Sequence, residues 1–277
     1  MTPTMPRFVF VAGLHRTGTS LLSRLIASHR SVSAIENSSA PEDEGCYLQG
    51  AIPHTALHGI PGQFATDPAE HHIEEGRFDT LETRNRLLAD WSPWFDADAS
   101  WWLEKSPVNL TRMRLYQQLF PMAQFVVILR HPQIMAAALA KWSDRSPEEL
   151  VRYGIEAYQR MECDLARLHA VVVIRYEDLV DDPDSIIGGV LAFLGLDNTW
   201  HKSTIRNGNA DYPEVSPLEP EHKADLARWG YTPAGGVGSF EPIVRHPLRD
   251  VRERTAAAFA SRSFGVEKKE QKANFGQ

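Results

Sequence analysis

The chain has 277 residues, of which 43% are hydrophobic, so it is long enough for one large α/β domain. Its 29 basic and 36 acidic residues give a formal charge of −7, which argues against a general nucleic-acid or anionic-membrane surface. Its two cysteines provide no disulfide framework, and the apolar run near the N-terminus is too short to span a membrane. We therefore expect a single cytoplasmic domain over residues 1–277, without a membrane span.

Residues 7–20 predict a buried strand, a tight loop and the start of a helix. Residues 8–12 are continuously apolar, which is typical of a parallel strand covered on both faces. Gly13 and Gly18 then bracket a short loop, and Thr19 and Ser20 open a run with helical apolar spacing. The first N–H groups of a helix have no intrahelical partner, and the helix dipole adds positive charge there. This junction therefore predicts an anion site.

The loop favours a single phosphate over a triphosphate. Its G-x-x-x-x-G spacing matches a nucleoside-triphosphate loop up to the second glycine, but Thr19 stands where that motif has its lysine. Without this lysine a triphosphate loses its main positive partner. Arg16, inside the loop, can bind one phosphate in a bidentate manner. We expect a 5′-phosphate that carries one further group.

Later segments predict further strands that end at the same edge of a sheet. Residues 102–107 lead into a helix, with Ser106 as a possible N-cap and Pro107 at the first helical position. Residues 125–129 form a second buried run that ends on Arg130, where α/β proteins bind ligands. A third run at 171–175 leads into a polar turn. This alternation predicts an α/β fold with a central parallel sheet and helices on both faces.

Two regions fall outside this alternation. Residues 40–103 contain no convincing buried strand, and we expect an insertion of helices and loops across the carboxyl edge of the sheet. Residues 267–277 are highly charged, and we expect a disordered tail.

Four motifs in order carry a resemblance to a known family. The chain resembles sulfotransferases that use 3′-phosphoadenosine 5′-phosphosulfate (PAPS), above all the bacterial branch that is similar to tyrosylprotein and heparan sulfotransferases. The resemblance implies a P-loop-like three-layer fold, PAPS as cofactor, 3′,5′-ADP as product and no metal ion. The motifs are G-L-H-R-T-G-T-S at 13–20, E-K-S-P at 104–107, L-R-H-P at 129–132, and R-Y-E-D-L at 175–179 with F-L-G-L at 193–196.

The resemblance assigns the cofactor-binding residues position by position. Tyr176 would contact adenine or pack beside the sheet, and Arg206 resembles the basic loop that closes over the 3′-phosphate in cytosolic relatives. Arg130 matches the arginine that binds the 3′-phosphate. The residues implied for the 5′-phosphate and the sulfate are Arg16, Thr17, Gly18, Thr19 and Ser20.

The chain departs from the family pattern at one cofactor position. The family usually has a serine eight residues after the 3′-phosphate arginine, and this chain has Ala138 there. One contact to the 3′-phosphate is therefore missing or supplied from elsewhere, and Lys141 and Ser143 are nearby in sequence. The expected result is weaker binding of the same cofactor, since one charge-assisted hydrogen bond contributes about 1.5–3 kcal/mol.

Two kinds of catalytic residue follow from the resemblance. Lys105 matches the family lysine near the bridging oxygen or the sulfuryl group, where a cation stabilises the charge that develops during transfer. A general base must also accept the proton of the attacking hydroxyl. Glu36 is the first choice, although a register shift of one residue would place Asn37 there. The alternatives are Glu42, Glu44 and His54.

Two other functions and several acceptors stay open. A nucleotide-dependent kinase would need magnesium, and a non-catalytic protein would bind 3′,5′-ADP without turnover. The acceptor could be a carbohydrate, a small-molecule metabolite or a phenol, and it would bind near the insertion at 40–103. Four tryptophans of that region either line the acceptor pocket or pack in the core. They are Trp91, Trp94, Trp101 and Trp102.

Overall fold

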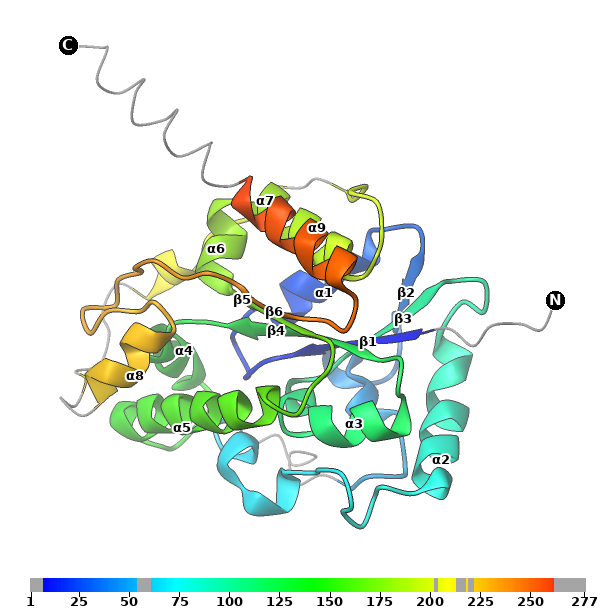
Figure 1. The fold of residues 1–277 in the computed structure, drawn as a ribbon. Coiled ribbons are helices and arrows are strands. Elements are labelled where there is room, and N and C mark those ends of the chain that lie inside the picture. The colour runs from blue at the N-terminus through cyan, green and yellow to red at the C-terminus, as the bar shows by residue number, and fades with distance from the viewer. Residues whose placement is uncertain (1–6, 54–60, 202–203, 213–217, 219–221, 262–277) are drawn as a thin grey trace.

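A six-stranded sheet forms the centre of the computed structural model, which describes residues 7–53, 61–201, 204–212, 218 and 222–261 (Figure 1). The strand order is β2-β3-β1-β4-β5-β6, and all neighbours are parallel except β5 and β6. The predicted α/β fold with a mainly parallel sheet is therefore confirmed. The strands are β1 (Arg7–Ala12), β2 (Val32–Ala34), β3 (Trp101–Lys105), β4 (Gln124–Leu129), β5 (Val171–Arg175) and β6 (Ile243–Arg245).

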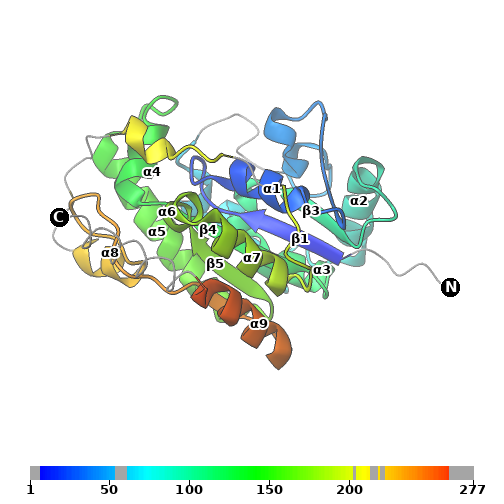
Figure 2. The ribbon, with the colours of Figure 1, turned by 90° about the horizontal axis from the view of Figure 1, so that it is seen from above.

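Helices cover both faces of the sheet, as Figures 1 and 2 show. One face carries α1 (Thr19–Ala27), α6 (Tyr176–Asp181), α7 (Pro183–Phe193) and α9 (Arg249–Ala260). The other carries α3 (Met113–Leu119), α4 (Pro132–Leu139), α5 (Pro147–Leu165) and α8 (Lys223–Arg228), with α2 (Leu81–Trp91) at its margin. Alternate residues of β1 serve the two cores: Val9 and Val11 pack on the α1 side, and Phe8 and Phe10 on the other.

The connections change direction next to β1, and this places the site. The chain leaves β1 through α1 toward β2, whereas it leaves β4 through α4 and α5 toward β5 on the opposite side. The carboxyl ends of β1 and β4 therefore border a crevice, where open α/β sheets bind ligands. The predicted phosphate loop follows β1, and Arg130 follows β4.

The insertion contains helices and loops, but its last residues belong to the sheet. β3 begins at Trp101, within the segment for which no buried strand was expected, and it lies between β1 and β2. Besides α2, the described part has short 3-10 helices. They are η1 (Pro41–Asp43), η2 (Gly45–Tyr47), η4 (Phe64–Thr66), η5 (Pro68–Glu70) and η6 (Ser92–Trp94). The tail at 267–277 lies outside the described residues.

Ser106 is the residue before η7 (Pro107–Thr111), but its side chain makes no cap. Pro107 stands at the first position of this 3-10 helix, as expected. The Ser106 hydroxyl instead donates to Glu104 and accepts from the Cys46 N–H. Ser106, predicted as an N-cap, thus belongs to a buried hydrogen-bond network beside Lys105, the predicted catalytic lysine.

Candidate active site

The loop after β1 is held by internal hydrogen bonds and by close packing at its two glycines. The Thr17 N–H and hydroxyl both donate to the Leu14 carbonyl, the hydroxyl at 2.7 Å. A Cβ at Gly13 would lie 2.6 Å from the Thr17 Oγ1 and 2.8 Å from the Ile128 carbonyl. Gly18 has a φ of +100°, and a Cβ there would lie 2.6 Å from Tyr176. Neither position accepts a side chain without rearrangement.

A cavity of about 610 Å³ opens in front of this loop. The predicted cofactor residues other than Thr17 all line it: Arg16, Gly18, Thr19, Ser20, Arg130, Tyr176 and Arg206. Thr17 is fully buried and its hydroxyl is used inside the loop, so its side chain holds the loop in shape instead of facing the cavity. The start of α1 is directed at the same space, which favours an anion there.

Arg130 is buried and fixed by two hydrogen bonds, with one nitrogen left over. Its side chain is 5% exposed, and burial lowers the pKa of the guanidinium. Its Nε donates to the Asn209 side chain at 2.8 Å, and its Nη1 donates to the Arg16 carbonyl at 2.7 Å. The buried Nη2 has no hydrogen-bond partner. A buried cation with a free donor at the edge of a cavity is suited to bind an anionic oxygen.

Tyr176 lies between the phosphate loop and the segment around residue 208. Its ring packs on Gly18 and lies 4.6 Å from the Arg130 guanidinium. Its hydroxyl accepts from the Gly208 N–H at 2.8 Å and donates to the Arg206 carbonyl. The Arg206 side chain itself is 78% exposed and forms an ion pair with Asp211. Arg206 thus borders the cavity, but a carboxylate holds its guanidinium.

A second cavity of about 460 Å³ adjoins the first, and the two share Ser20, Arg24 and Glu42 as lining residues. Lys105 and Glu36, predicted as the catalytic pair, both line the second cavity. Glu42 borders both cavities and accepts a hydrogen bond from the Ser20 hydroxyl at 3.3 Å. His54, the remaining candidate base, lies outside the described residues.

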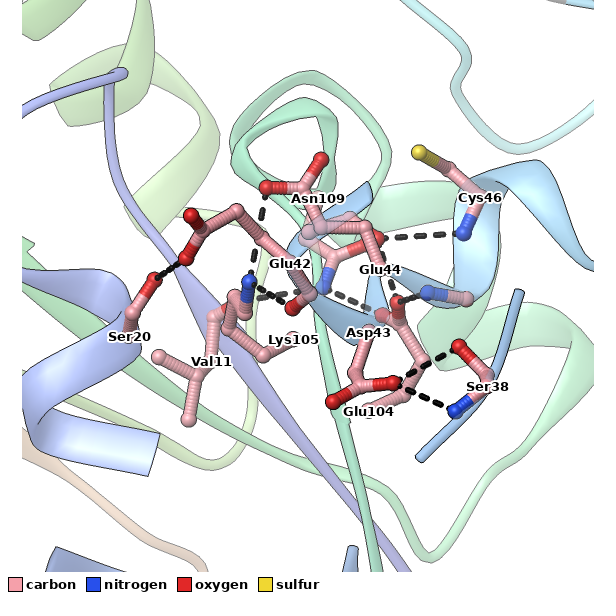
Figure 3. A network of polar contacts seen from close by, with 12 residues as sticks. Val11, Ser20, Ser38, Glu42, Asp43, Glu44, Cys46, Glu104, Lys105 and Asn109 are labelled. Atoms are coloured by element: carbon pink, nitrogen blue, oxygen red, sulfur yellow. Dashed lines mark hydrogen bonds and ion pairs between the residues drawn. The ribbon is translucent and has the colours of Figure 1, made fainter. Parts of the chain in front are cut away.

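Lys105 is enclosed by the segment at 42–44, as Figure 3 shows. Its Nζ donates to the Glu42 carbonyl at 2.6 Å and lies 3.4 Å from the Glu44 Oε1. Burial raises the pKa of the Glu44 carboxyl to about 7, although the Lys105 ammonium opposes the rise. Glu44 lines neither cavity. It is therefore better placed to hold Lys105 than to contact an acceptor.

The model of the sulfotransferase family matches residues 6–202 of the chain. The chain belongs to this family. By family it is a PAPS-dependent enzyme that transfers a sulfuryl group. The resemblance inferred from the four motifs is confirmed.

Several solved structures of other proteins are similar to this chain at low sequence identity. A sulfotransferase from Alicyclobacillus acidocaldarius is 21% identical, with 81% of this chain and 94% of that chain covered and a TM-score of 0.47. A sulfotransferase from Mycobacterium tuberculosis is 16% identical, with 92% and 78% covered and a TM-score of 0.44. A retinol dehydratase in complex with retinol and PAP is 14% identical, with 99% and 83% covered and a TM-score of 0.36. A comparison with curated proteins gives no match.

Glu104, next to Lys105 on β3, holds the segment around Glu44 in place (Figure 3). It is fully buried, and burial raises the pKa of its carboxyl. It accepts hydrogen bonds from the Gly45 N–H at 3.0 Å and from the Ser106 and Asn109 side chains. Asn109 also donates to the Val11 carbonyl on β1. This Glu104 network joins the segment around Glu44 to the strand that carries the phosphate loop.

Three residues near the cavities were missed by sequence reasoning. Arg24 lines both cavities, and its position four residues after Ser20 on α1 could have indicated this. Asn209 holds Arg130, and Tyr212 lines the first cavity. The last two come from a segment without helical or strand periodicity, so the sequence offered no comparable signal for them.

The tryptophan cluster takes no part in the described site. Trp91, Trp101 and Trp102 are buried in the core, and Trp94 packs against it, as one of the two interpretations predicts. Within the described ranges, no group of three His, Cys, Asp or Glu side chains could hold a metal ion. None of the helices in these ranges is long and apolar enough to cross a membrane.

Proposed function

We propose that this sulfotransferase binds PAPS in the first cavity and transfers the sulfuryl group to a hydroxyl of an acceptor in the second cavity. The observation that carries the proposal is the junction of the two cavities at Ser20, Arg24 and Glu42. The phosphate loop lies on one side of this junction, and Lys105 lies on the other. The products are a sulfate ester and 3′,5′-ADP.

The residues around the first cavity fit a nucleotide with a 5′-phosphosulfate and a 3′-phosphate. The loop and the start of α1 supply N–H groups for the 5′-phosphate. The unpartnered Arg130 Nη2 supplies a charged donor for the 3′-phosphate. Thr19 occupies the place of the triphosphate lysine, which disfavours the kinase alternative.

The chemistry is an in-line displacement at sulfur. The acceptor oxygen forms a bond to the sulfur while the bond from sulfur to the 5′-phosphate oxygen breaks. Lys105 stabilises the negative charge that develops on that leaving oxygen, and a carboxylate takes the proton of the hydroxyl. To reach the sulfuryl group, the Lys105 ammonium has to exchange its contacts with Glu42 and Glu44 for contacts with the donor.

The lining of the second cavity favours a hydroxyl-rich acceptor, of the carbohydrate type, over a phenol. Glu36, Asn37, Glu42 and Asp43 offer oxygens that accept hydrogen bonds from hydroxyl groups. No aromatic side chain of the described ranges lines this cavity. The carboxylates also disfavour an anionic acceptor.

Thermal-shift titration tests the cofactor. A ligand that binds only the folded state, at a hundred times its dissociation constant, adds about 2.7 kcal/mol to the stability. We expect 3′,5′-ADP to raise the Tm, and Arg130→Ala to reduce this rise by weakening binding more than tenfold. ADP and ATP with magnesium are the comparison ligands. A rise with ATP and magnesium but none with 3′,5′-ADP would contradict the proposal and favour a kinase.

Glu42 is the better-placed of the two exposed candidate bases, because the reacting hydroxyl has to lie where the cavities meet. Glu42→Gln should lower turnover about a hundredfold without weakening 3′,5′-ADP binding, since an amide cannot accept the proton. Glu36→Gln is the matched control, because it makes the same change in the same cavity. Initial rates of 3′,5′-ADP release, with an acceptor found by screening, decide between them. A larger loss for Glu36→Gln would assign the proton to Glu36, the first choice from the sequence.

A further inference from the structure

The family's usual hydroxyl contact to the 3′-phosphate has no equivalent at residue 138. Ala138 lies on α4 and is fully buried, so its methyl group packs in the core. A phosphate beside Arg130 would therefore accept a hydrogen bond from the one unpaired guanidinium nitrogen of that residue and none from position 138. A site that binds a dianionic group generally supplies more than one donor.

Gly208 packs next to the buried Arg130 Nη2 and the Tyr176 hydroxyl. A Cβ at Gly208 would lie 3.7 Å from this Nη2 and 3.0 Å from the Tyr176 hydroxyl. Arg130 and the segment at 206–212 thus border the same cavity. The nearest arginine of that segment, Arg206, is paired with Asp211, and this carboxylate itself borders the cavity. A second positive charge has to come from another element.

Lys141 is in position to supply that charge. It follows α4 by two residues, and its Nζ lies 3.5 Å from the Tyr212 hydroxyl and 5.0 Å from the centre of the Tyr212 ring. The Arg130 guanidinium lies 5.7 Å from the centre of the same ring. Among the described residues, no carboxylate forms an ion pair with Lys141, in contrast to Arg206.

The neighbouring residue, Trp142, packs on the phosphate loop. The Trp142 ring lies 4.5 Å from the Arg16 guanidinium, and Arg16 belongs to the phosphate loop. The Trp142 N–H donates to the Leu139 carbonyl, which continues the last turn of α4. Residues 141 and 142 therefore contact two residues that line the first cavity, Trp142 at Arg16 and Lys141 at Tyr212.

We propose that Lys141, positioned by Tyr212, provides the contact to the 3′-phosphate that Ala138 cannot make. This inference rests on the proposed function, because it takes a 3′-phosphorylated nucleotide as the ligand of the first cavity. A lysine ammonium on a flexible four-carbon chain can turn from the Tyr212 hydroxyl toward a phosphate in the first cavity. The Lys141 ammonium thus replaces the serine hydroxyl that the family usually has at the position of Ala138.

The test is a comparison of two nucleotides by isothermal titration calorimetry. 3′,5′-ADP and 5′-AMP differ only in the 3′-phosphate, so the ratio of their affinities measures the contacts to that group. We expect Lys141→Ala to weaken 3′,5′-ADP about tenfold, or about 1.4 kcal/mol, and to leave 5′-AMP unchanged. Lys141→Arg, which keeps the charge, should retain most of the wild-type ratio of the two affinities. Tyr212→Phe should lose part of it, because the hydroxyl that holds the ammonium is gone.

Arg152→Ala is the control for an overall change of charge. Arg152 is exposed on α5 and lines neither cavity, and its removal should leave both affinities unchanged. An unchanged ratio in Lys141→Ala would overturn the inference and leave the proposed function standing. Equal weakening of both nucleotides would also overturn it, because the effect would not depend on the 3′-phosphate. A wild-type protein that does not prefer 3′,5′-ADP over 5′-AMP would instead overturn the proposed function.

Discussion

Lys105→Ala should lower the rate of sulfuryl transfer about a thousandfold, because in the proposed mechanism it removes the cation that stabilises the developing negative charge. The residue is 5% exposed, and its ammonium contacts the Glu42 carbonyl and the Glu44 carboxylate, so no other cation can easily take its place. The loss should appear in kcat, with little change in the affinity for 3′,5′-ADP. In the proposed mechanism Lys105 acts on the sulfuryl group, and 3′,5′-ADP lacks that group. Steady-state rates with PAPS and calorimetry with 3′,5′-ADP measure the two quantities.

Lys105→Arg is the matched variant, because it keeps the charge and changes the shape. We expect it to recover part of the rate, whereas Lys105→Met, which has no charge, should be as slow as the alanine variant. A Lys105→Ala protein that kept a third of the wild-type kcat would show that the ammonium does not act on the transferred group. A wild-type protein that binds 3′,5′-ADP but sulfates no class of acceptor would favour the non-catalytic alternative.

Glu104→Ala should lower the free energy of unfolding by about 3 kcal/mol. The substitution leaves the Gly45 N–H and the Ser106 and Asn109 side chains without their shared acceptor. A buried donor without a partner costs about 1–3 kcal/mol, and the removal of a buried carboxylate with a raised pKa returns only part of this. Urea unfolding followed by circular dichroism measures the loss.

Two further variants show whether the Glu104 network is responsible. Glu104→Gln keeps one acceptor oxygen and the shape of the side chain, so its loss should be smaller. Glu156→Ala removes an exposed carboxylate from α5 and should change the stability by no more than about 0.5 kcal/mol. A loss below about 1 kcal/mol in Glu104→Ala would mean that water satisfies the three donors equally well.

The sequence predicts the central strands and the phosphate loop because these depend on local patterns. The apolar runs of β1, β4 and β5 and the glycines at 13 and 18 are sufficient to place them. β2 and β6 have three residues each, too few for a recognisable period, and β3 contains Glu104 and Lys105 in its five residues. A prediction that depends on apolar runs does not detect a strand that contains charged residues.

The junction of the two cavities could not be predicted, because it depends on contacts between distant residues and on unusual backbone conformations. Lys105 donates a hydrogen bond to the Glu42 carbonyl, although the two residues are 63 positions apart in the sequence. Asn37, Glu42 and Asp43 all have positive φ values, between 53° and 55°, which non-glycine residues rarely adopt. No local pattern in the sequence indicates such a turn. The choice between Glu36 and Glu42 therefore needs the three-dimensional arrangement.

The enclosure of Lys105 also bears on its reactivity as an amine. A lysine side chain is acylated only if a reagent can reach its nitrogen with the lone pair free. The Lys105 Nζ is buried and directs hydrogen bonds at the Glu42 carbonyl and the Glu44 carboxylate. Burial and these hydrogen bonds thus lower the reactivity of the Lys105 amine toward acylating reagents, while Lys141 is exposed to them.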